Sequence, residues 1–135
     1  MKDCIFCKIV KGELPSNKLY EDSEALAFLD ITPANLGHAL VIPKKHFKNI
    51  LETPEDIMAH MMKIVKKISH GLEALNPDGI NINMNNKEAA GQVVFHSHIH
   101  VIPRFKSDGF ELWHGKSEYK EGEKDKVVEK IIRAL

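Results

Sequence analysis

Residues 91–105 read GQVVFHSHIHVIPRF and place three histidines, His96, His98 and His100, at alternate positions of one short apolar run. In a β-strand, residues i, i+2 and i+4 point to the same face, and the rise is about 3.3 Å per residue. The alternation therefore predicts a strand in which all three imidazoles share one face.

The opposite face of this strand would carry Ser97, Ile99 and Val101. Burial with a period of two explains why the two aliphatic residues face a core, but it does not explain three imidazoles opposite them. Unrelated surface or core histidines are one interpretation. A second is a zinc site, and a third is a nucleophilic imidazole whose neighbours hold it in one tautomer. Spacing alone does not separate the last two.

The composition predicts one globular domain covering residues 1–135. Hydrophobic residues make up 43% and charged residues 28% of the chain, and 19 basic residues balance 19 acidic ones. This zero net charge argues against electrostatic capture of nucleic acid or acidic membranes. No apolar run approaches the roughly 20 residues that span a bilayer, and no leader is evident. We therefore expect a cytoplasmic protein without a membrane partner.

Turn residues and apolar periodicity predict the remaining elements. The segment 19–31 (LYEDSEALAFLDI) favours a hairpin around a turn at 21–23, and 39–42 favours a strand that closes near Pro43. Residues 80–83 (ININ) alternate like another strand. Strands outnumber helices and their connections are short, which predicts an α+β domain with an antiparallel sheet.

Two amphipathic helices are also expected. The longer one begins with Thr53 as cap and Pro54 in the first turn, and ends before the turn NPDG at 76–79. Its apolar residues recur at helical spacing: Ile57, Met61, Ile64, Val65, Ile68 and Leu72. The shorter one covers the C-terminal residues 123–135, with Val127, Val128, Ile131, Ile132 and Leu135 as its apolar set.

The histidine run and its flanks, AGQVVFHSHIHVIPRF, resemble the signature of the histidine-triad (HIT) family, in which three histidines alternate with apolar residues. CIFCKIVKGELPSNKLYED and AFLDITPANLGHALVIPKKHF also stand in the order typical of bacterial and archaeal members. The resemblance covers most of the chain. It implies an α+β homodimer with a nucleotide-binding cleft, which hydrolyses or transfers nucleotides at the α-phosphate through a covalent nucleotidyl-histidine.

The resemblance also implies catalytic roles by position. His98 matches the nucleophile, and His100 matches the residue that supports it and contacts phosphate. The backbone carbonyl of His100 is the implied partner for the second ring nitrogen of the nucleophile. His38 matches a histidine beside the same phosphate, and Gln92 matches a glutamine that reaches the phosphate or the leaving oxygen.

For the bound nucleotide, the resemblance assigns Asp30 to the ribose hydroxyls and Asn85 to the neighbourhood of the scissile bond. The implied apolar walls around a purine base are Phe6, Ile9, Leu14, Leu29 and Ile31. From the sequence alone these five would be ordinary core residues.

Two residues depart from the family pattern. Ser97 occupies a slot that is usually apolar, and we expect an effect on packing rather than on chemistry. Val93 lines the implied nucleotide site where a serine or threonine hydroxyl often assists the leaving group. Valine has no such donor, which argues against efficient phosphoramidase activity and leaves the nucleophile intact.

The two cysteines, Cys4 and Cys7, form a C-x-x-C pair. A redox pair normally follows a strand, and none precedes residue 4, so zinc is favoured, although the pair supplies only two of four ligands. The resemblance completes a closed structural Zn²⁺ site with His46 and His96. An open site formed by His96, His98 and His100 is the competing arrangement.

Two classes of function remain. The first is an enzyme acting on a purine nucleoside monophosphate joined to an amine or to another nucleotide, as in adenosine phosphoramidates or diadenosine polyphosphates. The residues HVIPRF stand where a glycine pair could follow the triad, and this slightly favours diadenosine polyphosphates over phosphoramidates as substrates. The alternative is a non-catalytic nucleotide-binding regulatory dimer. Nucleic-acid repair would need an additional basic domain. Trp113 and His114 are candidates for substrate choice, whereas His60 and His70 suit the surface or an interface.

Overall fold

The computed structural model describes residues 3–113, 115 and 117–135. Its helices are α1 (Ile5–Val10), α2 (Glu55–Leu72) and α3 (Glu123–Ala134), with short 3₁₀ turns η1 (Glu73–Leu75) and η2 (Glu88–Ala90). Its strands are β1 (Lys18–Glu21), β2 (Ala25–Leu29), β3 (Ala39–Pro43), β4 (Gly79–Asn83) and β5 (Ile99–Arg104). The predicted α+β class and the predicted hairpin are confirmed.

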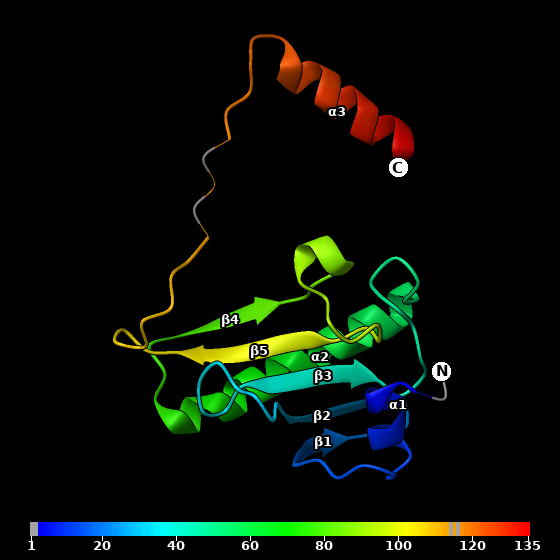
Figure 1. Ribbon diagram of the computed structural model, residues 1–135, viewed down its shortest axis with the longest axis vertical. Coiled ribbons are helices and arrows are strands. Elements are labelled where there is room, and N and C mark those ends of the chain that lie inside the picture. Colours follow the sequence, from blue (N-terminus) through cyan, green and yellow to red (C-terminus); the bar gives the residue numbers. More distant parts are fainter. Residues whose placement is uncertain (1–2, 114, 116) are drawn as a thin grey trace.

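The five strands form one sheet in the order β1-β2-β3-β5-β4, and every neighbouring pair is antiparallel. Because β3 and β5 are adjacent, with Ala39 opposite Val101, His38 just before β3 lies beside His100 of β5. Figure 1 shows α2 behind this sheet and α1 in front of it.

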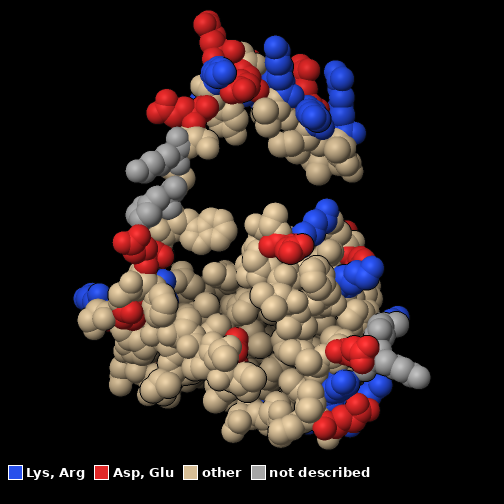
Figure 2. All heavy atoms as spheres, in the orientation of Figure 1, with Lys and Arg blue, Asp and Glu red and all other residues tan. Residues whose placement is uncertain are grey.

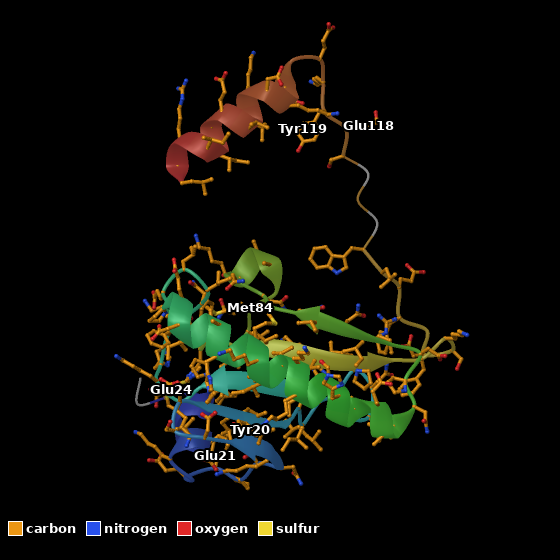
Figure 3. The ribbon with its side chains drawn as sticks, turned by 180° about the vertical axis from the view of Figure 1, so that it is seen from behind. Tyr20, Glu21, Glu24, Met84, Glu118 and Tyr119 are labelled. Atoms are coloured by element: carbon orange, nitrogen blue, oxygen red, sulfur yellow. The ribbon has the colours of Figure 1, made fainter. Side chains whose placement is uncertain are left out.

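Small residues face α2. Ala25, Ala27 and Ala39 of the sheet join Val41, Ile99 and Val101 under the helix residues Met61, Ile64, Val65, Ile68 and Leu72. The alanines let α2 approach closely, and the predicted apolar stripe of the helix is confirmed as its buried face. Tyr20 and Met84, labelled in Figure 3, close this core from opposite edges of the sheet.

Larger residues point to the other face of the same strands. Leu26, Phe28, Leu40 and Ile42 form a second cluster with Phe6 of α1. This alternation, small toward α2 and large toward α1, leaves a hydrophobic floor on the side of the sheet where α1 lies.

The predicted cap of α2 is wrong by one residue. The cap position is held by Pro54, and no side chain bonds to the first turn. Thr53 instead donates through Oγ1 to the carbonyl of Asn49 at 2.8 Å and lies 2.8 Å from Oγ of Ser97. The Thr53 hydroxyl is therefore used by Asn49 and the buried Ser97 and does not cap the first turn of α2.

The helix α3 is formed as predicted, but it contains no buried residue. It lies apart from the sheet, and Figure 2 shows open space between the two. The apolar side chains Val128, Ile131, Ile132 and Leu135 are all exposed. Within the described part of the chain, no helix combines the length and the apolar character needed to cross a membrane.

Candidate active site and metal centre

Only one of the three alternating histidines lies within a strand. β5 begins at Ile99, so His96 and His98 belong to the irregular segment before it, and the prediction of one strand for all three is wrong. The rings of His98 and His100 still lie together, with centroids 4.9 Å apart. The ring of His96 turns to a separate cluster, 4.9 Å from the ring of His46.

The imidazole of His98 is held by its neighbour's backbone. Its Nδ1 lies 2.6 Å from the carbonyl oxygen of His96, which can only accept a hydrogen bond, so Nδ1 carries the proton. The carbonyl that the family resemblance implied was that of His100, and this is corrected to His96. Nε2 of His98 therefore keeps its lone pair.

His96 and Ser97, which precede the nucleophile candidate, are fixed on several sides. The Nε2–H of His96 donates to the carbonyl of Pro43 at 2.8 Å. The backbone N–H of Ser97 donates to the carbonyl of Phe47 at 2.6 Å, and its buried hydroxyl meets Thr53. These bonds set the position of the carbonyl that orients His98.

A second chain of hydrogen bonds sets the tautomers of His38 and His100. The backbone N–H of Ala34 donates to Nδ1 of His38 at 3.0 Å, which leaves the proton on Nε2. That nitrogen lies 2.9 Å from Nδ1 of His100 and 3.6 Å from a carboxylate oxygen of Asp30. If His38 donates to His100, the Nε2 of His100 carries a proton and can donate to a bound anion.

These imidazoles are neutral at pH 7. Burial lowers the pKa of His98, and the His96 carbonyl and the charge of Asp30 only partly oppose this. Burial, together with the neighbouring His98 and His38, lowers the pKa of His100 to about 4. Burial likewise lowers the pKa of His38, against the charge of Asp30. A neutral His98 has the lone pair that a nucleophile requires.

A cleft of about 360 Å³ opens in front of His98 and His100. Of the residues predicted to bind a nucleotide, it is lined by Phe6, Ile9, Asp30, Ile31, Asn85, Val93, His98 and His100. Ile5, Phe28, Thr32, Leu40, Gly91 and Val94 also line it, although the sequence analysis did not assign them. Phe28 and Leu40 alternate with smaller residues along β2 and β3, and this alternation in the sequence could have predicted that they line the cleft.

Four predicted site residues, Leu14, Leu29, His38 and Gln92, do not line the cleft, although His38 contacts His100, which does. Leu29 instead lines a larger apolar pocket of about 560 Å³ beside α2, which contains none of the histidines. Leu14 is 38% exposed on the segment after α1.

Gln92 is buried, and its carboxamide bonds to backbone: Oε1 accepts from the N–H of Lys87, and Nε2 donates to the carbonyls of Lys48 and Val94. With these hydrogen bonds Gln92 stabilises its own loop. They give no support to the predicted contact between Gln92 and a phosphate.

The four residues predicted to hold zinc lie together. Cys4, Cys7, His46 and His96 offer ligand atoms that are all within 4.8 Å of one another. Sγ of Cys4 is 3.4 Å from Nδ1 of His96, and Sγ of Cys7 is 3.4 Å from Nδ1 of His46. Since Nε2 of His96 donates to Pro43, Nδ1 has its lone pair toward the thiols. Two sulfurs and two nitrogens match a tetrahedral zinc site.

The alternative metal arrangements fit less well. Among residues 3–113, 115 and 117–135, no close group of ligands contains His96, His98 and His100 together. Asp30, His38 and His100 do form a close group. The hydrogen bond from Ala34 places the proton of His38 on Nε2, the nitrogen that would have to bind the ion. This group is therefore better suited to hydrogen bonding than to coordination.

The remaining histidines and the tryptophan lie elsewhere. Nε2 of His60 is 2.7 Å from the carboxylate of Asp22 and ties α2 to the hairpin turn, while His70 is exposed. Trp113 is 88% exposed and lines a pocket with Asn83 and Arg104. His114 lies outside the described residues.

The comparisons with known proteins identify the family. Residues 11–107 match the HIT domain, and this chain belongs to that family. An uncharacterized HIT-like protein of Borreliella burgdorferi is 50% identical over 95% of this chain and 94% of its own. The crystal structure of a HIT family protein from Bacillus anthracis matches with a TM-score of 0.92 and 40% identity, over 98% of this chain and 97% of that one.

Two further relatives have more specific descriptions. The adenosine 5'-monophosphoramidase of Schizosaccharomyces pombe is 46% identical over 75% of this chain and 74% of its own. A zinc-bound histidine triad family protein from Mycobacterium smegmatis matches with a TM-score of 0.78 and 35% identity, over 99% of both chains. The family and fold that the sequence predicted are thus confirmed.

Proposed function

We propose that this protein is a purine nucleotide hydrolase or transferase that acts at the α-phosphate of nucleoside monophosphate derivatives through a covalent intermediate on His98. The observation that most supports this proposal is the hydrogen bond from Nδ1 of His98 to the carbonyl of His96. This bond leaves Nε2 unprotonated, with its lone pair available beside the cleft. The phosphoramidase of Schizosaccharomyces pombe supports the same class of chemistry.

In this proposal the cleft binds the nucleotide by its apolar floor and its polar end. The base lies against the buried rings of Phe6 and Phe28 and against the half-buried Ile9. The ribose hydroxyls donate to the carboxylate of Asp30, and the α-phosphate lies in front of the histidines. Asn85 contributes an amide close to the bond that breaks.

The reaction then has two steps. The lone pair of Nε2 of His98 forms a bond to phosphorus, and the bond from phosphorus to the leaving group breaks, with its electron pair going to the leaving group, which departs as an anion if it is a phosphate and takes a proton from water if it is an amine. A water molecule next attacks phosphorus and releases a proton to the solvent, the P–N bond breaks, and its electron pair returns to Nε2. The Nε2–H of His100 donates to the phosphoryl oxygens as their charge develops.

The leaving group is proposed to be oxygen-linked, as in a diadenosine polyphosphate. Val93 is 84% exposed at the rim of the cleft and has no proton to give to a departing amine. An amine leaves poorly without protonation, whereas a phosphate leaves as an anion.

Enzyme assays with a nucleophile variant test the proposal. Wild-type protein and His98→Asn would be offered adenosine phosphoramidate and diadenosine tetraphosphate, with His70→Asn as a matched control on an exposed histidine. We expect nucleotide release from wild type and control, and a loss of at least about a thousandfold in His98→Asn. Rapidly quenched wild-type protein should carry one nucleotidyl group in mass spectra. Equal background release by all three proteins would instead favour a non-catalytic nucleotide-binding protein.

We also propose a homodimer and a structural Zn²⁺. β4 is an edge strand of the sheet with Ile82 exposed, and α3 presents an uncovered apolar face, so both would gain from a second copy. Sedimentation should give twice the chain mass, and Ile82→Lys should shift it toward the monomer. Elemental analysis should find about one zinc per chain, lost in Cys4→Ala. A cytoplasmic location and a single domain over residues 1–135 stay predictions.

A further inference from the structure

The helix α1 is attached to the rest of the protein through its side chains. Among the described residues, the backbone of residues 4–14 hydrogen-bonds only within that segment, as in Lys8 N–H to the Cys4 carbonyl at 3.1 Å and Lys11 N–H to the Cys7 carbonyl at 3.1 Å. The first link from this end of the chain to the sheet is the bond from Leu29 N–H to the Asn17 carbonyl. The position of α1 therefore depends on what its side chains contact.

Those contacts are of two kinds, and they alternate along the segment. Cys4 and Cys7 point toward His96 and His46. Phe6, between them in sequence, is 5% exposed, and its ring packs edge-on against Phe28 at 5.6 Å and His98 at 5.2 Å. The thiols and the phenyl ring thus fasten one short helix to two different places.

The same helix forms one wall of the cleft. Ile5, Phe6 and Ile9 all line it, together with Asp30 and His100. A thiol is a weak hydrogen-bond donor, so contacts of 3.4–3.6 Å to imidazole hold the helix loosely. Coordinate bonds to zinc, which such a donor set can form, would hold it far more firmly.

The ring of Phe6 and the thiols of α1 contact His98 and His96, but the carbonyl that orients the nucleophile is also held by two hydrogen bonds from outside the helix. The carbonyl of His96 that receives the proton of His98 is fixed by the bonds from His96 to Pro43 and from Ser97 to Phe47. Neither bond involves α1. Loosening the helix should therefore disturb the wall that the base lies against more than the atom that attacks phosphorus.

We propose that zinc and nucleotide bind cooperatively, with Phe6 as the positioning residue that couples them through α1. This inference rests on the proposed function and on the proposed ligand set. Zinc on Cys4 and Cys7 holds the helix, the helix holds Phe6 against the cleft, and a nucleotide that packs on Phe6 in turn keeps the thiols in place. Coupling between two binding sites is reciprocal, so the two effects have the same size at equilibrium.

The test follows zinc release from the zinc-loaded protein. A chromophoric chelator in excess would report the rate of release with and without saturating AMP, so the stripped protein need not remain folded. We expect AMP to slow release about tenfold, within the range usual for coupled sites. In parallel, removing zinc should raise KM about tenfold and leave kcat within about twofold.

The decisive variant is Phe6→Leu, which keeps all four proposed ligands. It should retain its zinc, bind AMP more weakly, and release zinc at nearly the same rate with and without AMP. Undiminished slowing by AMP in Phe6→Leu, or no slowing in wild type, would overturn the coupling.

The outcomes separate the proposals. Wild-type protein that binds AMP equally with and without zinc refutes the coupling and leaves the proposed function standing. Wild-type protein that binds no AMP refutes both, and protein that takes up no zinc refutes the ligand set and the coupling but not the enzyme.

Discussion

Nδ1 of His98 lies 2.6 Å from the carbonyl oxygen of His96, so the backbone two residues before the candidate nucleophile fixes its tautomer. A side-chain exchange cannot remove this carbonyl, but it can loosen the segment that carries it. That segment is fixed from the side by the buried hydroxyl of Ser97, which is fully inaccessible to solvent.

The pair formed by Ser97 and Thr53 predicts unequal effects of removing either hydroxyl. Thr53 gives its only proton to the carbonyl of Asn49 at 2.8 Å, so in the contact with Ser97 it must accept. Thr53→Val leaves a buried donor on Ser97 without a partner and should cost about 1–3 kcal/mol of unfolding free energy. Ser97→Ala leaves Thr53 bonded to Asn49 and should cost about 1 kcal/mol.

Denaturant unfolding of both single variants and of the double variant measures this difference. The double variant should lose less stability than the two single variants together, because no unpaired donor remains. Strict additivity would show that the two hydroxyls do not interact.

Val93→Ser adds a hydroxyl at a position of the cleft where valine offers none. The side chain is 84% exposed, so stability should change by no more than about 0.5 kcal/mol. If a proton donor limits the departure of an amine, the variant should hydrolyse adenosine phosphoramidate about tenfold faster than wild type, with little change for diadenosine tetraphosphate. Val93→Ala, which shortens the side chain without adding a donor, is the control, and an equal gain in both variants would contradict the explanation.

Two glycines on either side of the C-terminal end of α2 should respond in opposite directions to alanine. At Gly37, φ is +98°, and an added Cβ would lie 2.5 Å from Cδ1 of Leu75 and 3.3 Å from Cδ2 of Leu72. Gly37→Ala should therefore destabilise the fold by about 1–3 kcal/mol and disturb the adjacent His38.

Gly71 is the matched control because it lies within α2 and a Cβ there would meet open space. Gly71→Ala should raise the unfolding free energy by about 0.5–1 kcal/mol. Chemical denaturation of both variants checks the pair, and a neutral Gly37→Ala would show that Leu75 yields at little cost.

Local periodicity predicted the sheet and the long helix, whereas most of the cleft was predicted from the family resemblance. Phe6, Ile9 and Asp30 reach the cleft as the family resemblance implied. The predictions for His96 and Gln92 were less complete because both depend on contacts between distant segments. The direction of the His96 ring is set by Pro43 and the thiols, and the carboxamide of Gln92 is taken up by Lys48 and Lys87. No spacing rule within residues 91–105 contains that information.

The neutral histidines of the cleft predict how stability depends on pH. Burial, His98 and His38 lower the pKa of His100 to about 4 from its ordinary 6.5. Between pH 6.5 and 4, the unfolded chain binds a proton at this position and the folded protein does not. The unfolding free energy must therefore fall as the pH falls through this window, by at most about 1.4 kcal/mol per pH unit for this one imidazole.

The variant His100→Asn isolates this contribution, because the other buried histidines titrate in both proteins. Urea unfolding at several pH values between 7 and 4 should give a shallower dependence for the variant than for wild type, and the two curves should run parallel above pH 7. A steeper dependence in the variant would mean that the folded protein takes up the proton more readily than the unfolded chain. That result would contradict a neutral His100, and with it the hydrogen bond that Nδ1 of His100 accepts from Nε2 of His38.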